Sequence, residues 1–254
     1  MRLLFSEYKS DYQHYIFPYA IWALPDDEHS PDDLFGAGFL PSSRQLDRFY
    51  MCRHIRVRLA DFSTSSENRR IFRKGEHVEH RLLKRDEFDF TSEWRQFCHE
   101  YTKARFKGEA MSSERLDELF SSPVCSHVLE FYERETQKSL GIVVLYLNHP
   151  GVAFYYYSFY DLEAFKNLGM YMMTATVQTM QEQGFEYIYL GSCYSRSALY
   201  KTQFSGCEFW NGFRWSDDVK ELKFMIERDQ QPVESHLLEN PDFVDSFYPK
   251  GFGS

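Results

Sequence analysis

The segment Tyr187–Trp215 reads Tyr-Ile-Tyr-Leu-Gly-Ser-Cys-Tyr-Ser-Arg-Ser-Ala-Leu-Tyr-Lys-Thr-Gln-Phe-Ser-Gly-Cys-Glu-Phe-Trp-Asn-Gly-Phe-Arg-Trp. It begins with the aromatic and β-branched residues of a strand and is interrupted at Gly191. A short helix carrying Lys201 is expected next, and the aromatic run that ends at Trp215 predicts a final strand. This order of elements predicts an α/β architecture.

The preceding residues supply more strands and one long helix. The polar turn Glu133–Lys138 and the turn signal Asn148-His149-Pro150-Gly151 separate three apolar runs of strand length. The predicted strands are Ser126–Tyr132, Leu140–Leu147, Val152–Tyr160, Phe185–Leu190 and Glu208–Trp215. The predicted helices are Phe90–Phe106, Asn167–Gly184 and Ser195–Phe204. In Phe90–Phe106, aromatic residues recur at helical spacing, which indicates a face buried in the core.

The composition is that of a globular protein. The chain has 254 residues, of which 18% are aromatic, and it contains no apolar run long enough to span a membrane. Charged residues soon interrupt the N-terminal segment, so no signal peptide is expected. Five cysteines without paired spacing fit a reducing compartment better than a disulfide framework. A cytoplasmic location is therefore expected.

The net charge of −9 hides a local basic segment. Between Leu40 and Arg85 there are 12 Lys and Arg against 5 Asp and Glu. Such a patch on an acidic body can bind a polyanion locally, while the rest of the surface repels it. The alternative is a solvated helix whose arginines pair with neighbouring glutamates.

The basic segment is predicted to contain a strand and a helix. Phe49–Phe62 alternates, so Ile55, Val57 and Leu59 are expected to face the core, with Arg56 and Arg58 on an exposed face. The run Ser63-Thr64-Ser65-Ser66-Glu67 then predicts the capped start of a helix. That helix carries Arg69, Arg70, Arg73 and Lys74.

The order β-β-β-α-β-α-β over Ser126–Trp215 resembles that of a GNAT-type acetyltransferase domain. The expected fold is therefore α/β (α+β), with a mixed, mostly antiparallel sheet flanked by helices and an N-terminal basic accessory region. We expect three parts, with the basic region at 1–90, the transferase domain at 91–225 and an acidic tail at 226–254. The residues after Ser216 are expected to form a last helix and a loosely held end.

Two stretches resemble the aminoacyl-tRNA–protein transferases, the arginyltransferases and their bacterial leucyltransferase relatives. The first is Cys52-Arg53-His54-Ile55-Arg56-Val57-Arg58-Leu59-Ala60-Asp61-Phe62, followed by the paired arginines at 69 and 70. The second joins Tyr157-Ser158-Phe159-Tyr160-Asp161 and Leu168-Gly169-Met170-Tyr171 to Tyr187–Gly191 and Tyr200-Lys201. The resemblance implies transfer of an amino acid of the Arg or Leu class from aminoacyl-tRNA to a protein N-terminus.

The chain departs from this family at its N-terminal cysteines. Family members carry a cluster of them, and here only Cys52 remains, with Ala20 and Trp22 near the place of an earlier one. A single thiolate cannot build a four-ligand zinc or iron–sulfur site. We therefore expect no metal and no cofactor, with aminoacyl-tRNA acting as co-substrate.

The reaction that the resemblance implies needs orientation, a proton acceptor and a partner for the oxyanion, because the ester is already activated. The catalytic candidates are Asp161, Tyr160, Tyr189 and Lys201. Tyr160 and Tyr189 are expected to be neighbours at strand ends, and Asp161 is expected to bind or deprotonate the acceptor ammonium. Lys201 is expected to contact the terminal phosphate of tRNA or the acidic side chain of an acceptor N-terminus. The alternatives are that Asp161 only begins a turn, that the tyrosines are core residues and that Lys201 only ends a helix.

The candidates for binding the tRNA backbone are Arg56, Arg69, Arg70, Arg73 and Lys74, because phosphates are recognised by charge rather than by base sequence. The expected partners are thus aminoacyl-tRNA and protein or peptide N-termini, without a membrane.

Two alternatives remain. An acetyl-CoA-dependent N-acetyltransferase would cradle the pyrophosphate on bare amides at a helix N-terminus. Here Lys166-Asn167-Leu168-Gly169-Met170-Tyr171 has the first glycine of such a loop, but Tyr171 fills the second small position and is expected to crowd the pyrophosphate. The other alternative is a catalytically inactive binding protein of the same fold. His54, His77 and His80 are interpreted as structural, since no second set of ligands accompanies them.

Overall fold

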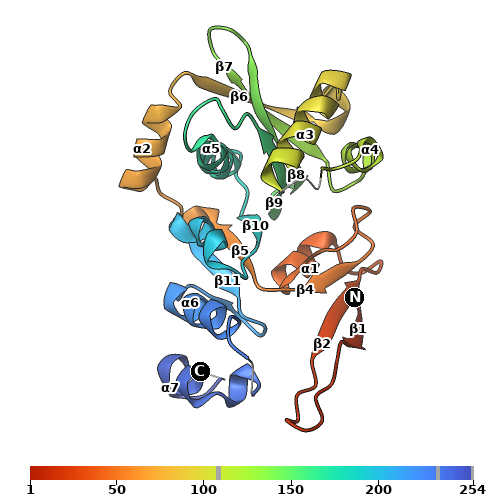
Figure 1. Ribbon diagram of the computed structural model, residues 1–254, viewed down its shortest axis with the longest axis vertical. Coiled ribbons are helices and arrows are strands. Elements are labelled where there is room, and N and C mark those ends of the chain that lie inside the picture. The colour runs from red at the N-terminus through yellow and green to blue at the C-terminus, as the bar shows by residue number, and fades with distance from the viewer. Residues whose placement is uncertain (107–109, 233–234, 253–254) are drawn as a thin grey trace.

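The computed structural model describes residues 1–106, 110–232 and 235–252. Its strands form an eight-stranded sheet and a separate four-stranded sheet at the N-terminal end of the chain (Figure 1).

The eight-stranded sheet runs in the order β12-β11-β5-β10-β9-β8-β7-β6. Its strands are β5 (His54–Arg58), β6 (Val78–Lys84), β7 (His127–Glu133), β8 (Ser139–Asn148), β9 (Val152–Tyr160), β10 (Tyr187–Ser192), β11 (Cys207–Trp210) and β12 (Trp215–Ser216). All neighbouring pairs are antiparallel except β9 and β10. Helix α5 (Leu168–Glu182) makes the crossover that a parallel pair requires.

Helices cover both faces of this sheet (Figure 1). The core on one face joins α5 to residues of α2 (Ser66–Lys74), α6 (Val219–Arg228) and α7 (Pro241–Phe247). The core on the other face joins residues of α3 (Ser92–Arg105), α4 (Ser113–Ser121) and α1 (Pro31–Gly36). Because α5 is apolar on most of its circumference, it is buried between the sheet and α2.

The four-stranded sheet has the order β1-β2-β4-β3 and is antiparallel throughout. It consists of β1 (Arg2–Glu7), β2 (Tyr19–Leu24), β3 (Phe39–Pro41) and β4 (Phe49–Met51). The hairpin of β1 and β2 projects from the rest of the molecule in Figure 1.

The expected fold class is confirmed, with a mixed, mostly antiparallel sheet flanked by helices. The predicted helix over residues 63–74 is α2, whose start is capped by Ser65 and Asn68. Three details differ from the prediction. Phe49–Phe62 is broken into β4, β5 and a 3₁₀ turn, residues 196–203 form 3₁₀ turns, and Glu208–Trp215 is divided between β11 and β12.

The residues after Ser216 form helices α6 and α7, so the expected helix is present, but the end of the tail is packed. The ring of Phe243 in α7 and that of Tyr248 are buried in the same core as α5. The Tyr248 hydroxyl also donates a hydrogen bond to Glu221 of α6 at 2.8 Å. Residues 237–248 are therefore packed against the main sheet rather than loosely held. The division at residue 90 stays a prediction, although the sheet takes β5 and β6 from before it.

Among the described residues, none of the helices combines the length and apolar character that a bilayer-spanning segment needs.

Candidate active site

The candidate active site is a cleft of about 750 Å³ where β9 and β10 diverge. The two strands pair only from Val152 opposite Tyr187 to Phe154 opposite Tyr189. Beyond this point β9 continues to Tyr160, and its residues Tyr155, Ser158 and Tyr160 line the cleft. The first turn of α5, the end of α3, part of α2 and the 3₁₀ turns after β10 complete the walls.

Tyr160 and Asp161 lie at the end of β9, as the sequence predicts, and both line the cleft. The Asp161 carboxylate accepts a hydrogen bond from the Glu163 amide at 2.9 Å and pairs with Lys138 at 3.1 Å. Burial alone would raise the pKa of Asp161, but the Glu163 amide and the Lys138 ammonium together hold it below its usual value. Asp161 therefore both begins a turn and presents an anion to the cleft.

The ring of Tyr160 lies against two other walls of the cleft. Its centroid is 4.9 Å from that of Tyr101 in α3. On the other side it packs against Gly169 in the first turn of α5, where a β-carbon would come within 2.7 Å of the Tyr160 hydroxyl oxygen. The phenol of Tyr160 therefore stands beside the positive end of the α5 dipole.

Two further cations line the cleft, Arg105 at the end of α3 and Lys166 just before α5. Within the described part of the chain, neither forms an ion pair, so both guanidinium and ammonium are available to a ligand. The apolar part of the lining comes from Ile71, Leu168 and Met173 among others. The cleft thus combines apolar walls with unpaired positive charge.

A smaller hollow of about 430 Å³ adjoins the cleft. Tyr101, Tyr160, Asp161 and Leu162 line both spaces, so this group of residues forms the boundary between them.

The prediction that Tyr189 neighbours Tyr160 is wrong. Tyr189 pairs with Phe154, six residues before Tyr160 on β9. Only 1% of Tyr189 is exposed, and its ring packs against Phe35 at 4.9 Å within the other core. Burial raises the pKa of its hydroxyl to about 12. Tyr189 has the position of a core tyrosine.

Lys201 lies after β10 but does not line the cleft, whereas Tyr200 and Gln203 beside it do. The Lys201 ammonium donates a hydrogen bond to the Ser192 carbonyl at 2.9 Å. Burial lowers the pKa of Lys201. The contact with Ser192 fixes the loop after Gly191, whose φ of +83° favours glycine.

The prediction that Arg56 is exposed is also wrong. Only 8% of Arg56 is exposed, and its Nε donates a hydrogen bond to Glu208 at 2.7 Å. Its guanidinium is held between the rings of Trp215 at 3.8 Å and Tyr187 at 4.2 Å. Arg56 therefore joins β5, β10 and the β11–β12 hairpin internally, and its charge is already neutralised.

The other basic candidates are exposed on α2. Arg70 pairs with Glu67 one turn earlier, and Arg69 donates a hydrogen bond to the Thr64 carbonyl at 2.6 Å. Arg73 and Lys74 form no ion pair with any described residue and remain open to solvent. Glu67 and Ile71 of the same helix line the cleft, whereas Arg73 and Lys74 lie in the last turn of α2 and are not among the lining residues.

Tyr171 is expected from the sequence to crowd a pyrophosphate at the start of α5, but its side chain is buried in the core. Its ring packs against Phe72 and Phe131, and its hydroxyl donates a hydrogen bond to the Val78 carbonyl at 3.1 Å. Tyr160 occupies the space beside Gly169 instead.

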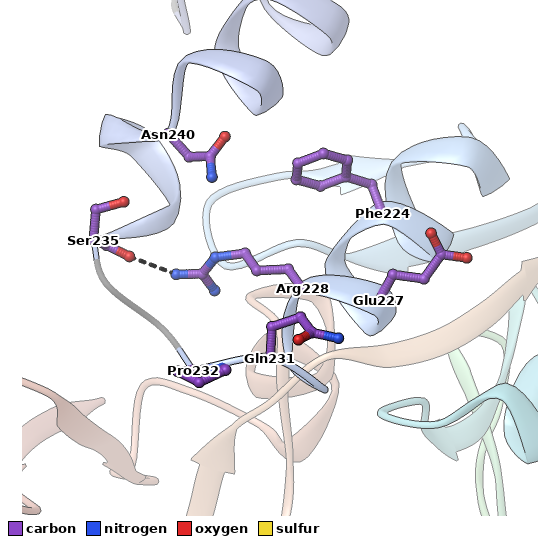
Figure 2. Close-up of a pocket in the computed structure, with 7 residues that line it drawn as sticks. All are labelled: Phe224, Glu227, Arg228, Gln231, Pro232, Ser235 and Asn240. Atoms are coloured by element: carbon purple, nitrogen blue, oxygen red, sulfur yellow. Dashed lines mark hydrogen bonds between the residues drawn. The ribbon is translucent and has the colours of Figure 1, made fainter.

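Another hollow, of about 450 Å³, lies between α6 and the segment that leads to α7 (Figure 2). Arg228 crosses it and donates a hydrogen bond to the Ser235 carbonyl at 2.7 Å. None of the predicted site residues lines this hollow.

Within residues 1–106, 110–232 and 235–252, no three His, Cys, Asp or Glu side chains are grouped so that they could hold a metal ion. All five cysteines are free thiols, and Cys52 is buried. His54 is fully buried beside it, donates from Nδ1 to the Cys52 carbonyl at 2.8 Å and fits the structural role expected of it.

Most residues of the cleft lie in a part of the chain that matches a known protein family. Residues 93–211 match the family model described as "Arginine-tRNA-protein transferase, C terminus". Over this region the chain is similar to the arginine-tRNA-protein transferases. All the residues that line the cleft fall within the matched range, apart from Glu67 and Ile71 of α2.

Curated relatives carry the name aspartate/glutamate leucyltransferase. The protein of Ruegeria pomeroyi is 27% identical over 176 residues, which cover 65% of this chain and 61% of the relative. That of Cereibacter sphaeroides is 28% identical over 181 residues, which cover 65% of this chain and 62% of the relative. The chain thus spans about three fifths of the length of these aminoacyl-tRNA–protein transferase relatives.

Among solved structures, L-PGS from Bacillus licheniformis is similar, with a TM-score of 0.44 and 13% identity. The alignment covers 56% of this chain and 46% of that one.

Sequence reasoning missed Tyr101, Arg105 and Lys138 as site residues. Tyr101 belongs to the aromatic stripe of α3, which the sequence assigns to the core, and its ring does pack against Phe159. Arg105 follows that stripe by one turn, so its position near the cleft depends on how α3 crosses β9. Lys138 is a turn residue, and no local pattern relates it to Asp161.

Proposed function

We propose that this protein transfers an amino acid, leucine in the first instance, from aminoacyl-tRNA to the N-terminal amine of an acceptor protein. The observation that carries the proposal is the location of the cleft inside the region matched by the transferase family. The curated relatives, named for leucyl transfer, favour leucine over arginine. Apolar lining residues such as Ile71, Leu168 and Met173 suit a leucyl side chain.

The charges around the cleft support an aminoacyl-tRNA as donor. The 3′ end of tRNA brings phosphates to the site, and these require positive partners. Arg105 and Lys166 line the cleft and form no ion pair with a described residue, and Arg73 and Lys74 are exposed in the last turn of α2. Arg69 and Arg70 are exposed on the same helix and extend the basic surface.

The reaction joins the acceptor nitrogen to the ester carbonyl carbon and breaks the bond from that carbon to the ribose oxygen. The α-ammonium must first lose a proton, and the Asp161 carboxylate is the anion placed to bind the ammonium and to receive that proton. The Tyr160 hydroxyl, beside the first turn of α5, is placed to donate to the developing oxyanion. As the amide forms, the attacking nitrogen gives up a second proton, and the departing ribose oxygen takes up this proton and leaves as a hydroxyl group.

In this proposal the co-substrate supplies all the activation, so neither metal nor cofactor takes part. A supply of charged tRNA and of newly exposed protein N-termini is found in the cytoplasm, where an enzyme of this kind would act in N-degron turnover.

The test is incubation with radiolabelled leucyl-tRNA and a peptide that begins with Asp or Glu. Labelled peptide is expected, with arginyl-tRNA and acetyl-CoA as comparison donors. Asp161→Asn should lower the rate by roughly 100-fold, whereas Asp86→Asn, at an exposed carboxylate that does not line the cleft, should not. Absence of transfer from both tRNAs, together with acetylation from acetyl-CoA, would refute the proposal.

A further inference from the structure

The smaller hollow beside the cleft differs from it in charge. Its charged lining residues are Glu100, Asp161, Glu163 and Lys138, which leaves a net negative charge. The larger cleft contains Arg105 and Lys166 against Glu67 and Asp161. A phosphate-bearing donor is therefore disfavoured in the smaller hollow, and a ligand with a positive group is favoured there.

The two spaces meet at the residues that the reaction needs. Tyr160 and Asp161 line both, and Tyr101 packs against Tyr160 at the boundary. A chain end entering through the smaller hollow would thus bring its α-ammonium to Asp161, next to a donor ester held in the larger cleft. This geometry fits the acceptor polypeptide.

Lys138 is the only cation lining the smaller hollow in the described part of the chain. Its side chain is 64% exposed, and its ammonium pairs with Asp161 at 3.1 Å. An arriving α-ammonium that binds Asp161 competes with Lys138 for the same carboxylate. Lys138 then needs a new anion within a short distance.

We infer that Lys138 is a specificity-determining residue that binds the side-chain carboxylate of an acceptor beginning with Asp or Glu. Such a residue carries a positive and a negative group close together, as the Lys138–Asp161 pair does. When the acceptor binds, the ion pair between Lys138 and Asp161 is replaced by two new ones. The acceptor ammonium then pairs with Asp161, and its side-chain carboxylate pairs with Lys138. The identity of the acceptor as a polypeptide N-terminus rests on the proposed function.

Acceptors with other first residues are disfavoured, because their binding would leave the Lys138 ammonium without an anionic partner. An acceptor that begins with Asn or Gln displaces Lys138 from Asp161 and offers no anion in return. An N-acetylated peptide lacks the ammonium, so the pair stays closed and Asp161 has no ligand to exchange.

The first experiment measures binding without tRNA. Peptides that differ only at the first residue, Asp or Asn, carry a fluorophore at the C-terminus, and an N-acetyl-Asp peptide is the third ligand. The wild type should bind the Asp peptide about 10-fold more tightly than either other peptide, as expected for one charged hydrogen bond. Lys138→Met should bring the Asp and Asn peptides within about 3-fold of each other.

Lys103→Met is the matched control, since Lys103 is exposed on α3 and lines neither hollow. It should leave the Asp preference unchanged. The same comparison is then made for kcat/KM of leucyl transfer, and Lys138→Glu should shift the preference toward a peptide that begins with Lys. Thermal melting checks that each variant is folded.

The outcomes separate this inference from the proposed reaction. Asp-selective binding that depends on Lys138, without transfer from any aminoacyl-tRNA, supports the acceptor site and overturns the reaction. Transfer with an Asp preference that survives Lys138→Met supports the reaction and overturns the role of Lys138. A wild type that does not discriminate Asp from Asn in binding or in transfer also overturns it.

Discussion

The ring of Tyr160 covers Gly169 so closely that a β-carbon on residue 169 would lie 2.6 Å from the ring carbon that bears the hydroxyl. This contact joins the end of β9 to the first turn of α5, which are the two elements that place the candidate proton acceptor and the positive helix end. Glycine at 169 is thus required by the close approach of the ring and not by the backbone conformation, since no positive φ is found there.

Gly169→Ala tests this contact. In an exposed helix the change would stabilise by roughly 0.5–1 kcal/mol, but here the methyl group must displace the Tyr160 ring. We expect transfer activity to fall at least about 10-fold while the protein stays folded. Gly36→Ala is the control, because its β-carbon would meet open space. Unchanged kcat/KM in Gly169→Ala would show that the position of Tyr160 does not matter.

Because Arg56 is buried in an ion pair with Glu208, its replacement should lower the stability of the protein. The sequence alone instead predicts that its replacement would weaken tRNA binding. Arg56→Met leaves Glu208, 9% exposed, with Arg58 as its one ion-pair partner among the described residues. The free energy of unfolding in urea should fall by about 2–4 kcal/mol, somewhat less than for a fully unpaired buried charge. The double variant Arg56→Met with Glu208→Gln should recover part of this loss. Wild-type stability in the single variant would contradict the buried ion pair.

The sequence predicts well what depends on neighbouring residues and poorly what depends on distant ones. The start of α2 follows from a capping box formed within residues 65–68, and the β7–β9 strands follow from turns next to them. The burial of Arg56 does not follow, because Glu208 lies 152 residues further along the chain. Alternation alone assigns Arg56 to a solvated face, since an ion pair between aromatic rings leaves no local pattern.

In the candidate site, too, features set by neighbouring residues are predicted well and features set by distant residues are not. Tyr160 and Asp161 end a strand that the sequence locates well, so their place in the cleft is as predicted. The place of Tyr189 depends on the register between β9 and β10, and that register is set by a crossover through α5. Both strands begin at the Val152–Tyr187 pair, but Tyr189 is the third residue of β10 and Tyr160 is the last of nine residues in β9, so the two tyrosines lie six positions apart along the sheet.

His54 predicts a pH dependence of stability. Burial lowers its pKa to about 3, and the unfolded chain should titrate near 6.5. Above pH 6.5 the histidine is neutral in both states and contributes no pH dependence. As the pH falls from 6.5 toward 3, only the unfolded state gains the proton, so stability should fall by about 1.4 kcal/mol per pH unit from this group.

The measurement is urea unfolding of the wild type and His54→Gln between pH 7 and 4.5. The variant should show a smaller slope over this window, and His149→Gln, at an exposed histidine, should keep the wild-type slope. Equal slopes in all three proteins would mean that His54 gains its proton in the folded state.

The exposed end of α2 predicts a salt-dependent contribution to tRNA binding. Arg73→Gln with Lys74→Gln removes two positive charges that have no ion-pair partner among the described residues. Both lie on α2, the helix that contributes Glu67 and Ile71 to the cleft. Removing one charge that neutralises a phosphate should reduce the slope of log Kd against log salt by about 0.7–0.9, so the double variant should lower it by up to roughly 1.8. Lys220→Gln with Lys223→Gln makes the same charge change on α6 and should leave the slope unaltered, because α6 contributes no residue to the cleft whereas α2 contributes two. An equal reduction in both double variants would indicate a general effect of net charge and would remove α2 from the tRNA-binding surface.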